Sequence, residues 1–571
     1  MLICPKCLAF GKPRVSPHKA SVRRIVSCKM SRAVSSSDSG FFQKPPVLTN
    51  QFTSDPHLGR ILNLYVSHSV QQKAIPEFKS LGDIVVSEKI SRLIENAERE
   101  LPYVVQYDEW GRRIDKLVTS EGWRGMKVIA CENGLVADGY DNEKWQGQGR
   151  LVQFIKVYLF NPSSATFTCP LSMTDGAAQI LSRDPAFKEI FARLVSRDVS
   201  EMWTSGQWMT ERTGGSDVSR TETQATKTSS GYSITGFKFF SSATDSDMAL
   251  LLAQTPPSGL SLFYAPLRTA SGQGFNGVRI HRLKNKLGTR PLPTAELELR
   301  DMKGELVGKE GCGVKNISSV LNITRCWNAI SSISGAQRAW NIASAYAAER
   351  TVFGTQLNLL PTHLSLLSSM NLMLRGLTHL AFHTILFLGS GDVLLRLFAA
   401  VAKAYCAKKT IEIVSECLEA CGGQGYMEET SLPRLYRDSQ VLSIWEGTTN
   451  VLSSDVVKTI PKLVTELFAW AEKKGVRREM EEYLSRFDGM DQVVRFTRAR
   501  EISFELAELL VWALVKEDAE REDAGVFERE CLLYWKSARP QVETGSQAQD
   551  RAKIDYEIVY GRNPEYRHSR L

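Results

Sequence analysis

The hydrophobic period of the sequence changes twice, and this limits the chain to a fold with helices on both sides of a β module. From about Thr223 to Glu305, short apolar runs alternate with turn residues, a pattern typical of a small sandwich or barrel. From Pro45 to about Ser196, and again from Gly313 onward, apolar residues recur at helical spacing. We therefore expect a mainly α protein with a central β module.

These changes of period also divide the chain into domains. We expect a basic, Ser-rich leader over residues 1–40 and an N-terminal helical domain over 41–200. A middle β domain over 201–306 and a C-terminal helical bundle over 307–465 follow. Residues 466–571 are expected to add an extra helical region that ends in a polar tail.

Helical spacing predicts individual elements as well. The expected helices of the second half cover residues 314–328, 329–350, 362–388, 393–421, 451–474, 478–487, 493–514 and 524–534. Residues 100–145 are interpreted as polar and aromatic loop. The most apolar stretch, Leu364 to Leu388, contains Arg375, His379 and His383, so we expect a core helix there and no transmembrane segment.

The charge of the chain is unevenly distributed. The formal charge is +8, and residues 1–45 account for all of it, with nine Lys or Arg and one Asp. The remaining body is neutral, so nothing in its overall charge favours a nucleic-acid partner. A basic, Ser-rich leader is typical of a mitochondrial transit peptide and equally of a disordered tail. Ser569-Arg570-Leu571 is a close variant of a peroxisomal address. We expect a peroxisome, with the mitochondrion as the alternative.

The eleven cysteines are scattered, which favours a reducing compartment over a disulfide framework. Cys4 and Cys7 have the spacing of half a zinc site, but no second pair follows, so we expect no metal site. Cys417 and Cys421 lie one helical turn apart in an apolar segment and are expected in the core.

Glu446 is the strongest candidate for a catalytic group. It follows Ile444 and Trp445 and precedes Gly447, so a carboxylate there can be desolvated and still reach a ligand. Desolvation raises the pKa of a carboxylate and makes it a competent general base near neutral pH. The alternative is a solvated glutamate at a helix end.

Three further stretches have unusual composition. Residues 208–217 contain paired glycines between Thr and Ser hydroxyls, which suit a phosphate or a flavin, although Gly-Gly-Ser-Asp is also an ordinary turn. Residues 236–242 place aromatics and two hydroxyls on a strand, where they would flank a planar cofactor or simply half-bury the strand. Residues 419–438 contain the run Gly-Gly-Gln-Gly.

Together, in this order, these motifs resemble the acyl-CoA dehydrogenase family of flavoproteins. The late family signature is matched from Glu419 to Asp438, and the early one from Met209 to Asp217, with departures at Trp208 and Arg220. The AidB-like, alkylation-response branch is the most similar, and the likeness covers about residues 41–535. The resemblance implies an N-terminal helical domain, a small β sandwich or barrel, a C-terminal four-helix bundle and an extra C-terminal helical region.

The resemblance also implies FAD as cofactor and assigns residues to it. The positions that match flavin or FAD contacts are Met209, Thr210, Ser216, Phe240, Ser241, Ser242, Arg350, Phe353, Gly423, Thr448 and Asn450. Of these, Arg350, Phe353 and Gly423 match positions that reach the FAD of a neighbouring subunit, which implies a homo-oligomer, usually a tetramer. Pro361 replaces a family Gln, which puts one contact in doubt.

In the family, the glutamate at the position of Glu446 removes the α-proton of an acyl thioester while a hydride leaves Cβ for flavin N5. Arg325 matches an arginine near the base, and we assign Ser216 and Arg325 to the substrate site as well; the alternative for Arg325 is an ordinary helix salt bridge. The expected partners are an acyl-CoA and an electron acceptor, either electron-transfer flavoprotein or oxygen.

Two other functions remain open at this point. A peroxisomal member of the family would act as an acyl-CoA oxidase. An AidB-like member would chiefly bind acyl-CoA or DNA, with little turnover. For DNA, residues 466–571 hold 18 basic and 22 acidic residues, with local basic clusters at 473–478 and 495–500.

Overall fold

The computed structural model describes residues 44–269, 274–542 and 544–561. By their contacts, the residues from Pro45 onward form one compact unit. The leader, the Cys4–Cys7 pair and the Ser569–Leu571 tripeptide lie outside the described residues.

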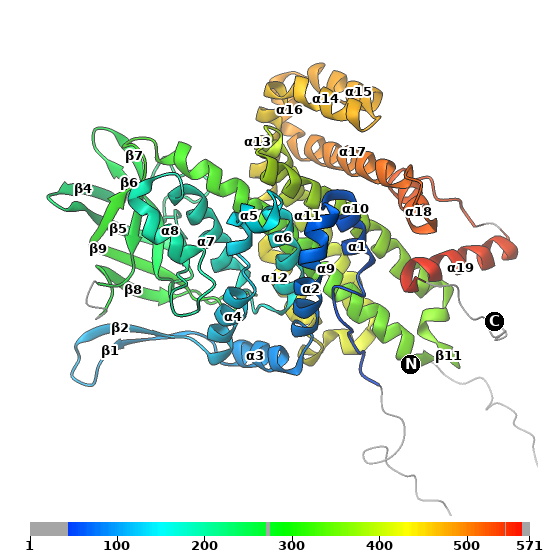
Figure 1. The fold of residues 1–571 in the computed structure, drawn as a ribbon, viewed down its shortest axis with the longest axis horizontal. Coiled ribbons are helices and arrows are strands. Elements are labelled where there is room, and N and C mark those ends of the chain that lie inside the picture. Colours follow the sequence, from blue (N-terminus) through cyan, green and yellow to red (C-terminus); the bar gives the residue numbers. More distant parts are fainter. Residues whose placement is uncertain (1–43, 270–273, 543, 562–571) are drawn as a thin grey trace, which may run out of the picture. The chain divides into compact units, whose positions relative to one another are not determined.

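Eight α-helices build the N-terminal part (Figure 1). They are α1 (Pro56–Tyr65), α2 (His68–Ile84), α3 (Glu88–Arg99), α4 (Glu121–Glu132), α5 (Asn142–Trp145), α6 (Gly149–Phe160), α7 (Thr168–Leu181) and α8 (Lys188–Leu194). Polar side chains begin several of them: Asp55 accepts hydrogen bonds from the first turn of α1, and Ser87 and Ser120 do the same for α3 and α4. Helix α6 is buried along its whole length, because it lies between α2, α9 and α10.

The loop expected over residues 100–145 is wrong over most of its length, because α4 and α5 occupy its second half and two strands occupy its first. Strands β1 (Tyr103–Tyr107) and β2 (Arg113–Val118) form an antiparallel hairpin there. The Asp108 carboxylate closes the turn by accepting the backbone N–H groups of Trp110 and Arg112. Val104 and Leu117 pack against the β module, and polar residues lie between the apolar ones. The alternation typical of a strand was therefore present in the sequence, but over too few residues to stand out.

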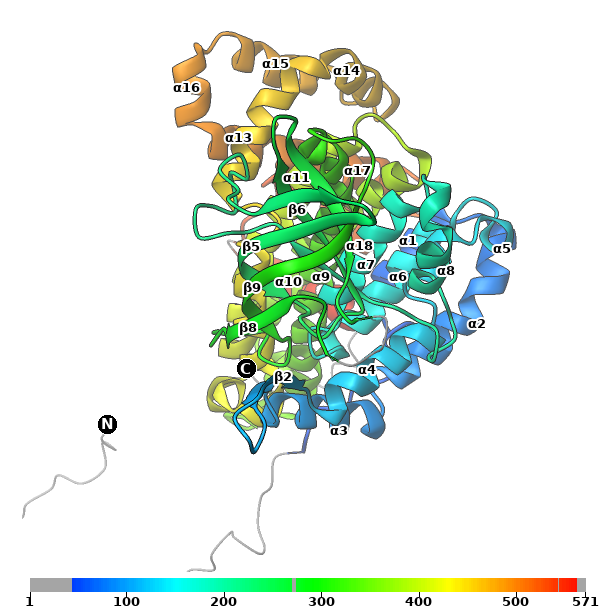
Figure 2. The same cartoon turned by 90° about the vertical axis from the view of Figure 1, so that its left-hand side faces the viewer.

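The middle of the chain folds into a closed β structure, as its strand spacing predicts. The strands are β3 (Ser205–Trp208), β4 (Gln224–Thr228), β5 (Gly231–Ser242), β6 (Met248–Thr255), β7 (Gly259–Pro266), β8 (Val278–Leu283) and β9 (Thr294–Leu306). Pairing runs from β4 through β5, β9, β7 and β6 and returns to β4, so these five strands form a ring. Strand β8 extends it at β9 (Figure 2). Strand β3 pairs with β6.

Long helices form the C-terminal bundle. They are α9 (Gly313–Glu349), α10 (Pro361–Ser390), α11 (Leu395–Ala420), α12 (Leu432–Leu442) and α13 (Thr449–Thr459), with a short hairpin of β10 (Thr351–Val352) and β11 (Thr355–Gln356) after α9. The two helices expected over 314–328 and 329–350 are one, because nothing between them breaks the backbone pattern. The helix expected over 451–474 is two, because Pro461 interrupts it.

The extra C-terminal region consists of α14 (Val464–Lys473), α15 (Arg477–Asp488), α16 (Gln492–Thr497), α17 (Ala499–Ala519), α18 (Val526–Trp535) and α19 (Gly545–Tyr560). The polar tail expected at the end is wrong over residues 545–560. Thr544 caps α19, and Tyr556, Ile558 and Val559 bury its inner face against α10. A buried ion pair between Asp518 on α17 and Arg60 on α1 ties this region to the N-terminal helices.

One described helix, α10, is long and apolar enough to cross a membrane. Of its most apolar window, 78% is buried inside the protein, as for a core helix.

Candidate active site

Glu446 lies in a strained turn between α12 and α13. Its φ is +57°, and that of Gly447 is +101°, so two consecutive residues adopt the left-handed region. This conformation is unfavourable for a residue with a Cβ and is held only where the surroundings fix it. Thr448 fixes the far side of the turn, since its side chain caps α13 by accepting the N–H of Val451.

The Glu446 carboxylate is half-buried and has one hydrogen bond to a side chain among the described residues. Thr324 on α9 donates its hydroxyl to Oε2 at 2.5 Å. Burial raises the pKa of Glu446 above its ordinary value, although the Thr324 hydroxyl, Arg325 and Lys403 favour the charged form. A carboxylate in this state accepts a proton more readily than a solvated one.

Arg325 is both near the base and in an ion pair. The catalytic interpretation and the salt-bridge interpretation each describe part of its surroundings. Its guanidinium lies 3.6 Å from Asp455 on α13, and the same carboxylate is 3.1 Å from Arg396. Its Nε has no hydrogen-bond partner within the described part of the chain. Burial lowers the pKa of Arg325, while Asp455 and Glu446 favour its charge.

Lys403 is a further residue of this site, and it was not predicted from the sequence. This residue of α11 is fully buried, and its Nζ donates to the carbonyl oxygen of Gly447 at 2.6 Å. Burial lowers the pKa of Lys403 to about 7, while the charge of Glu446 raises it. The only signal in the sequence was a lysine inside an otherwise apolar helical run, Ala399 to Ala404.

The β module contributes groups on the side of the base. Ser242 Oγ lies 3.1 Å from Thr294 Oγ1, which accepts a hydrogen bond from Lys286 Nζ at 3.2 Å. The Cys169 thiol on α7 interacts electrostatically with both Lys286 and Glu446, and burial raises its pKa to about 12. Lys286 Nζ also donates to the carbonyl oxygen of Thr289, and Thr289 lines the same cavity as Trp445, so this edge of the β module lies near the turn that carries Glu446.

The two residues before Ser242 on β5, Phe240 and Ser241, differ in exposure. Phe240 is half exposed, so its ring is available to a planar ligand. Ser241 is buried, and its hydroxyl has no partner among the described residues. The three positions that the sequence grouped together thus present an exposed ring, a buried hydroxyl and a partly buried one.

The segment after β3 has the close backbone approach that a phosphate needs. A Cβ on Gly215 would come within 2.9 Å of the Thr210 hydroxyl, and Ser216 beside it is exposed. Met209 packs on the core between β6 and α7, and the Thr210 carbonyl accepts the N–H of Phe239. Hydroxyls, a glycine cradle and an exposed ring fit a flavin nucleotide.

Thr448 and Asn450 are exposed at the start of α13, where a helix offers free N–H groups to an anion. This position fits the adenosine side of the same cofactor. Within the described ranges, no group of three or more His, Cys, Asp or Glu is arranged as metal ligands would be.

Arg350, Phe353 and Gly423 do not join this site. Because α9 is continuous, the rise of about 1.5 Å per residue puts Arg350 roughly 38 Å from Arg325. The β10–β11 hairpin lies at the end of α9 (Figure 1). Phe353 in its turn is 98% exposed with φ +50°. A Cβ on Gly423 would meet nothing within 4 Å. Pro361 is in the first turn of α10, where it provides no side-chain donor.

A small cavity of about 50 Å³ lies beside the base, between α7, α9, α11 and α12. Trp445, the residue before Glu446, forms one wall, and Ser331 and Gly335 of α9 form another. There is open space where a Cβ of Gly335 would be, and the buried Thr410 hydroxyl has no partner among the described residues.

The architecture and this site define a flavoprotein-type dehydrogenase fold, and comparison with known proteins identifies the family. Residues 206–302 and 311–460 match the family descriptions "Acyl-CoA dehydrogenase, middle domain" and "Acyl-CoA dehydrogenase, C-terminal domain". Residues 43–200 match "Adaptive response protein AidB N-terminal domain". The chain belongs to the acyl-CoA dehydrogenase family, with an AidB-type N-terminal domain.

Individual relatives agree with this assignment. "Acyl-CoA dehydrogenase family member 11" of Caenorhabditis elegans is 40% identical over 460 residues, 76% of this chain and 74% of the relative. "Putative acyl-CoA dehydrogenase AidB" of Escherichia coli K12 is 32% identical over 480 residues, 78% of this chain and 87% of the relative. The crystal structure of C. elegans ACDH-11 in complex with C11-CoA superimposes with a TM-score of 0.81 at 34% identity, over 94% of this chain and 99% of that one.

Proposed function

We propose that the protein is an FAD-dependent acyl-CoA dehydrogenase in which Glu446 is the general base. The observation that supports this most directly is a half-buried carboxylate with a raised pKa, held in a strained turn between Arg325 and Lys403. It borders the edge of the β module where Phe240 and Ser242 provide a ring-binding surface.

The residues of this chain then have defined roles. Glu446 takes the α-proton of the acyl thioester, and Thr324 orients its carboxylate. Arg325 and Lys403 favour the carboxylate form before the reaction. The backbone N–H of Glu446 is the protein donor for the thioester carbonyl, and one such donor typically contributes about 3–4 kcal/mol to the transition state. Bound FAD would supply the acceptor for the hydride that leaves Cβ.

The acyl chain is proposed to enter the cavity beside Trp445. Thr324, Asn328, Ser331 and Gly335 are spaced to share one face of α9, and they lead from the base into that cavity. This face is about 16 Å long. Because the cavity is only about 50 Å³, side chains along this face must move before a long acyl chain can occupy it. The C. elegans ACDH-11 structure was solved in complex with C11-CoA, which makes a long acyl-CoA the first substrate to test.

We also propose a homo-oligomer in which Arg350, Phe353 and Gly423 contact the cofactor of a neighbouring subunit. Arg350 and Phe353 follow the far end of α9 from Arg325, which leaves them no role in their own site. Size-exclusion chromatography with light scattering tests this, and a monomer that retains FAD contradicts it.

The main experiment mixes the purified flavoprotein with a panel of acyl-CoAs without oxygen. We expect bleaching of the flavin by wild type and none by Glu446→Gln. A flavin that no acyl-CoA bleaches contradicts the dehydrogenase. Adding oxygen or electron-transfer flavoprotein to the bleached protein then identifies the acceptor, since fast reoxidation by oxygen alone indicates an oxidase.

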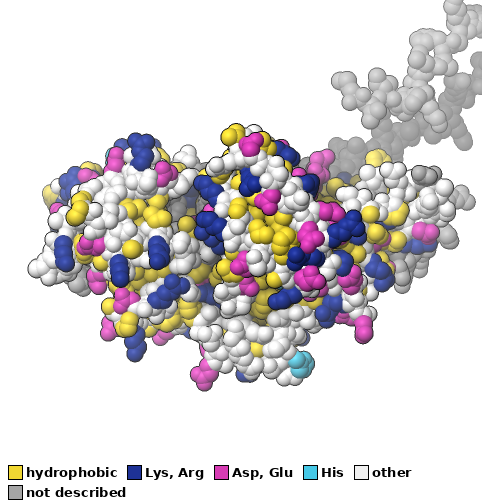
Figure 3. Space-filling view, turned by 90° about the horizontal axis from the view of Figure 1, so that it is seen from above, with side chains coloured by type: hydrophobic (Ala, Val, Ile, Leu, Met, Phe, Trp, Pro, Cys, Tyr) yellow, Lys and Arg dark blue, Asp and Glu magenta, His cyan; other side chains and the backbone are white. Residues whose placement is uncertain are grey.

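The DNA-binding alternative is less well supported. The basic residues of the extra region are largely paired: Arg477 with Glu481, Arg478 with Glu482 and Arg498 with Glu501. Basic and acidic side chains are interspersed on the face that carries α14 to α16 (Figure 3). Solvated helix faces of this kind rarely bind phosphate.

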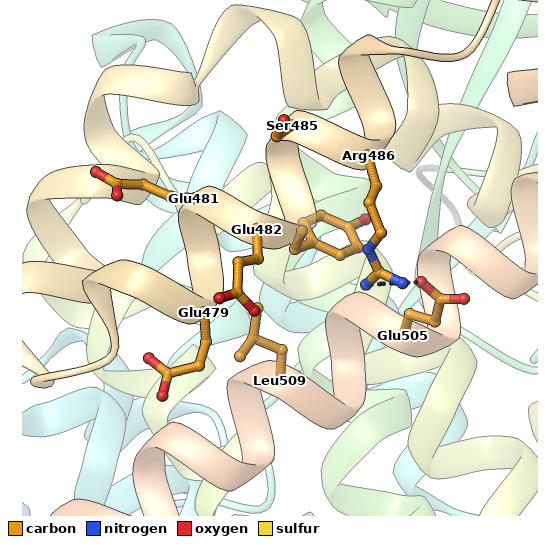
Figure 4. Close-up of a pocket in the computed structure, with 8 residues that line it drawn as sticks. Glu479, Glu481, Glu482, Ser485, Arg486, Glu505 and Leu509 are labelled. Atoms are coloured by element: carbon orange, nitrogen blue, oxygen red, sulfur yellow. Dashed lines mark ion pairs between the residues drawn. The ribbon is translucent and has the colours of Figure 1, made fainter.

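One groove of this region is lined mainly by acidic residues. This groove between α15 and α17 has Glu479, Glu481, Glu482 and Glu505 on its walls, and Arg486 there pairs with Glu505 (Figure 4). Such a surface repels a polyanion. A mobility shift of duplex DNA at physiological salt that is lost on neutralising Arg495 and Arg498 would revive this alternative.

The peroxisomal location stays a proposal. An N-terminally tagged chain should lose its peroxisomal distribution when Ser569–Leu571 are removed. A tagged chain that is not peroxisomal before the deletion contradicts this proposal, and mitochondrial staining of a C-terminally tagged chain would favour the mitochondrial alternative.

A further inference from the structure

Lys403 is buried without a carboxylate partner, which is rare for a lysine. Its side chain is on the bundle side of the active-site turn, and within the described residues no carboxylate oxygen lies within 4 Å of its Nζ. Lysines are almost never fully buried unless paired, because desolvation penalises the ammonium form. The position therefore calls for an explanation beyond packing.

The hydrogen bond of Lys403 fixes the centre of the turn that carries the base. Its Nζ holds the Gly447 carbonyl at 2.6 Å. On one side, the Trp445 N–H bonds to the last turn of α12; on the other, Thr448 caps α13. The two left-handed residues between these anchors have Lys403 as a third support, so the direction of the Glu446 side chain depends on it.

The charges around the turn assign Lys403 a second role. The groups that face it are Glu446 from the turn and Arg325 from α9, with Asp455 and Arg396 behind Arg325. Asp455 shares its negative charge between Arg325 and Arg396. Lys403 has no such partner, so its countercharge is the carboxylate of the base itself.

We infer that Lys403 is a positioning residue for the base: it holds the Glu446–Gly447 turn in its reactive conformation and keeps Glu446 ionised. This inference rests on the proposed function. Without Lys403, the turn loses its central support, and the carboxylate loses its unpaired neighbouring cation. Both changes weaken proton abstraction, and neither touches the acyl-CoA or the cofactor directly.

Three substitutions separate the two roles. Lys403→Met removes the donor and the charge, Lys403→Gln keeps a donor without the charge, and Lys403→Arg keeps both. Lys409→Met is the matched control, because Lys409 is on the same helix and pairs with Glu412 away from the turn. Thermal unfolding and the bound-flavin spectrum of the full-length protein show which variants fold and retain cofactor.

The probe is an acyl-CoA with sulfur in place of Cβ. It can lose its α-proton to the base but cannot deliver a hydride, so the long-wavelength absorbance of the anion beside the flavin reports proton transfer alone. We measure this absorbance against pH, and separately the rate of bleaching by the ordinary acyl-CoA.

For Lys403→Met we expect bleaching to slow about 10- to 100-fold, while the probe binds within about threefold of wild type. The acid limb of the probe absorbance should move to higher pH by a few tenths of a unit, less than in Thr324→Val, because a nearby cation has been removed. Lys403→Arg should restore the pH midpoint, whereas Lys403→Gln should restore part of the rate and not the midpoint.

An unchanged rate and midpoint in Lys403→Met overturns the inference, and so does a change of the same size in Lys409→Met. If Lys403→Met does not fold, the pH midpoints of the other two variants decide. A wild-type midpoint in Lys403→Arg and a shifted one in Lys403→Gln support the inference, and equal midpoints overturn it. Failure of the proposed function is distinguishable, since then the wild type shows no bleaching, and the probe still tests whether Lys403 controls the charge of Glu446.

Discussion

The β module and the helical bundle each bury one lysine beside one glutamate, and the two pairs differ in how well the carboxylate is satisfied. In the β module, Glu211 accepts hydrogen bonds from Lys238 Nζ, the Thr223 hydroxyl and the Glu222 N–H, all at 2.6 Å. In the bundle, Lys403 bonds to a backbone carbonyl, and Glu446 is left with the Thr324 hydroxyl.

The pKa values follow this difference. Burial raises the pKa of both carboxyls, but around Glu211 the Lys238 ammonium and the hydrogen bonds more than offset it, and the pKa falls. Around Glu446 burial dominates, and the pKa rises. A satisfied buried carboxylate holds structure together, whereas an under-satisfied one remains able to take a proton.

The largest expected effect is on catalysis at Glu446. Glu446→Gln should reduce the rate of flavin bleaching by about 10³-fold or more, because an amide cannot accept the α-proton. The melting temperature should not fall. Rapid mixing with acyl-CoA without oxygen measures the rate, and Glu481→Gln on the surface of α15 is the control. If Glu446→Gln bleaches at the wild-type rate, Glu446 is not the base, and it does not differ from Glu211 in function.

The opposite result is expected at Glu211. Glu211→Gln should lower the free energy of unfolding by about 3–5 kcal/mol, because it leaves the Lys238 ammonium buried without its countercharge. Denaturant titration measures this. The double change Glu211→Gln with Lys238→Met should recover much of the loss; a double variant as unstable as the single one would show that the ion pair is not the cause.

A smaller effect is expected at the acyl cavity. Gly335→Leu should reduce bleaching by long acyl-CoAs about 10- to 100-fold and leave butyryl-CoA nearly unchanged, because the new side chain fills the space beside Ser331. Gly335→Ala is the control: it fits the open space, and Ala favours a helix by about 1 kcal/mol over Gly. Equal losses at all chain lengths would place the acyl chain elsewhere.

The sequence was sufficient for the class of fold, because it depends on a local pattern, the period of the apolar residues. The choice of Glu446 as the base depends on a motif with a fixed order and stays a prediction. The sequence was insufficient for Lys403, whose role arises from α11 packing against a turn 44 residues away. It was also insufficient for the continuity of α9, which is buried on several sides and so lacks a clear polar face. The helix at 545–560 was missed because only part of one face is buried.

The smallest effect concerns the pH dependence of the two carboxyls. The folded-state pKa of Glu446 is raised, so the folded protein binds the extra proton, and stability falls as pH rises through the window above the unfolded value of about 4.3. The pKa of Glu211 is lowered, so its contribution is present above that value and is lost as pH falls through the folded pKa. Glu446→Gln should therefore stabilise the protein at pH 7 and have no such effect at pH 3.

Thr324→Val tests the same balance from the other side. The Thr324 hydroxyl lowers the pKa of Glu446, so its removal should raise that pKa further and move the acid limb of bleaching to higher pH by less than about one unit. At a fixed acidic pH this is a loss of at most about tenfold, and the rate should recover at higher pH. Thr324→Ser keeps the donor and should match wild type. An acid limb that moves to lower pH in Thr324→Val would mean that the hydroxyl stabilises the protonated base. The Thr324 hydroxyl would then act on Glu446 in the opposite direction from that of the Thr223 hydroxyl on Glu211, and the comparison would fail.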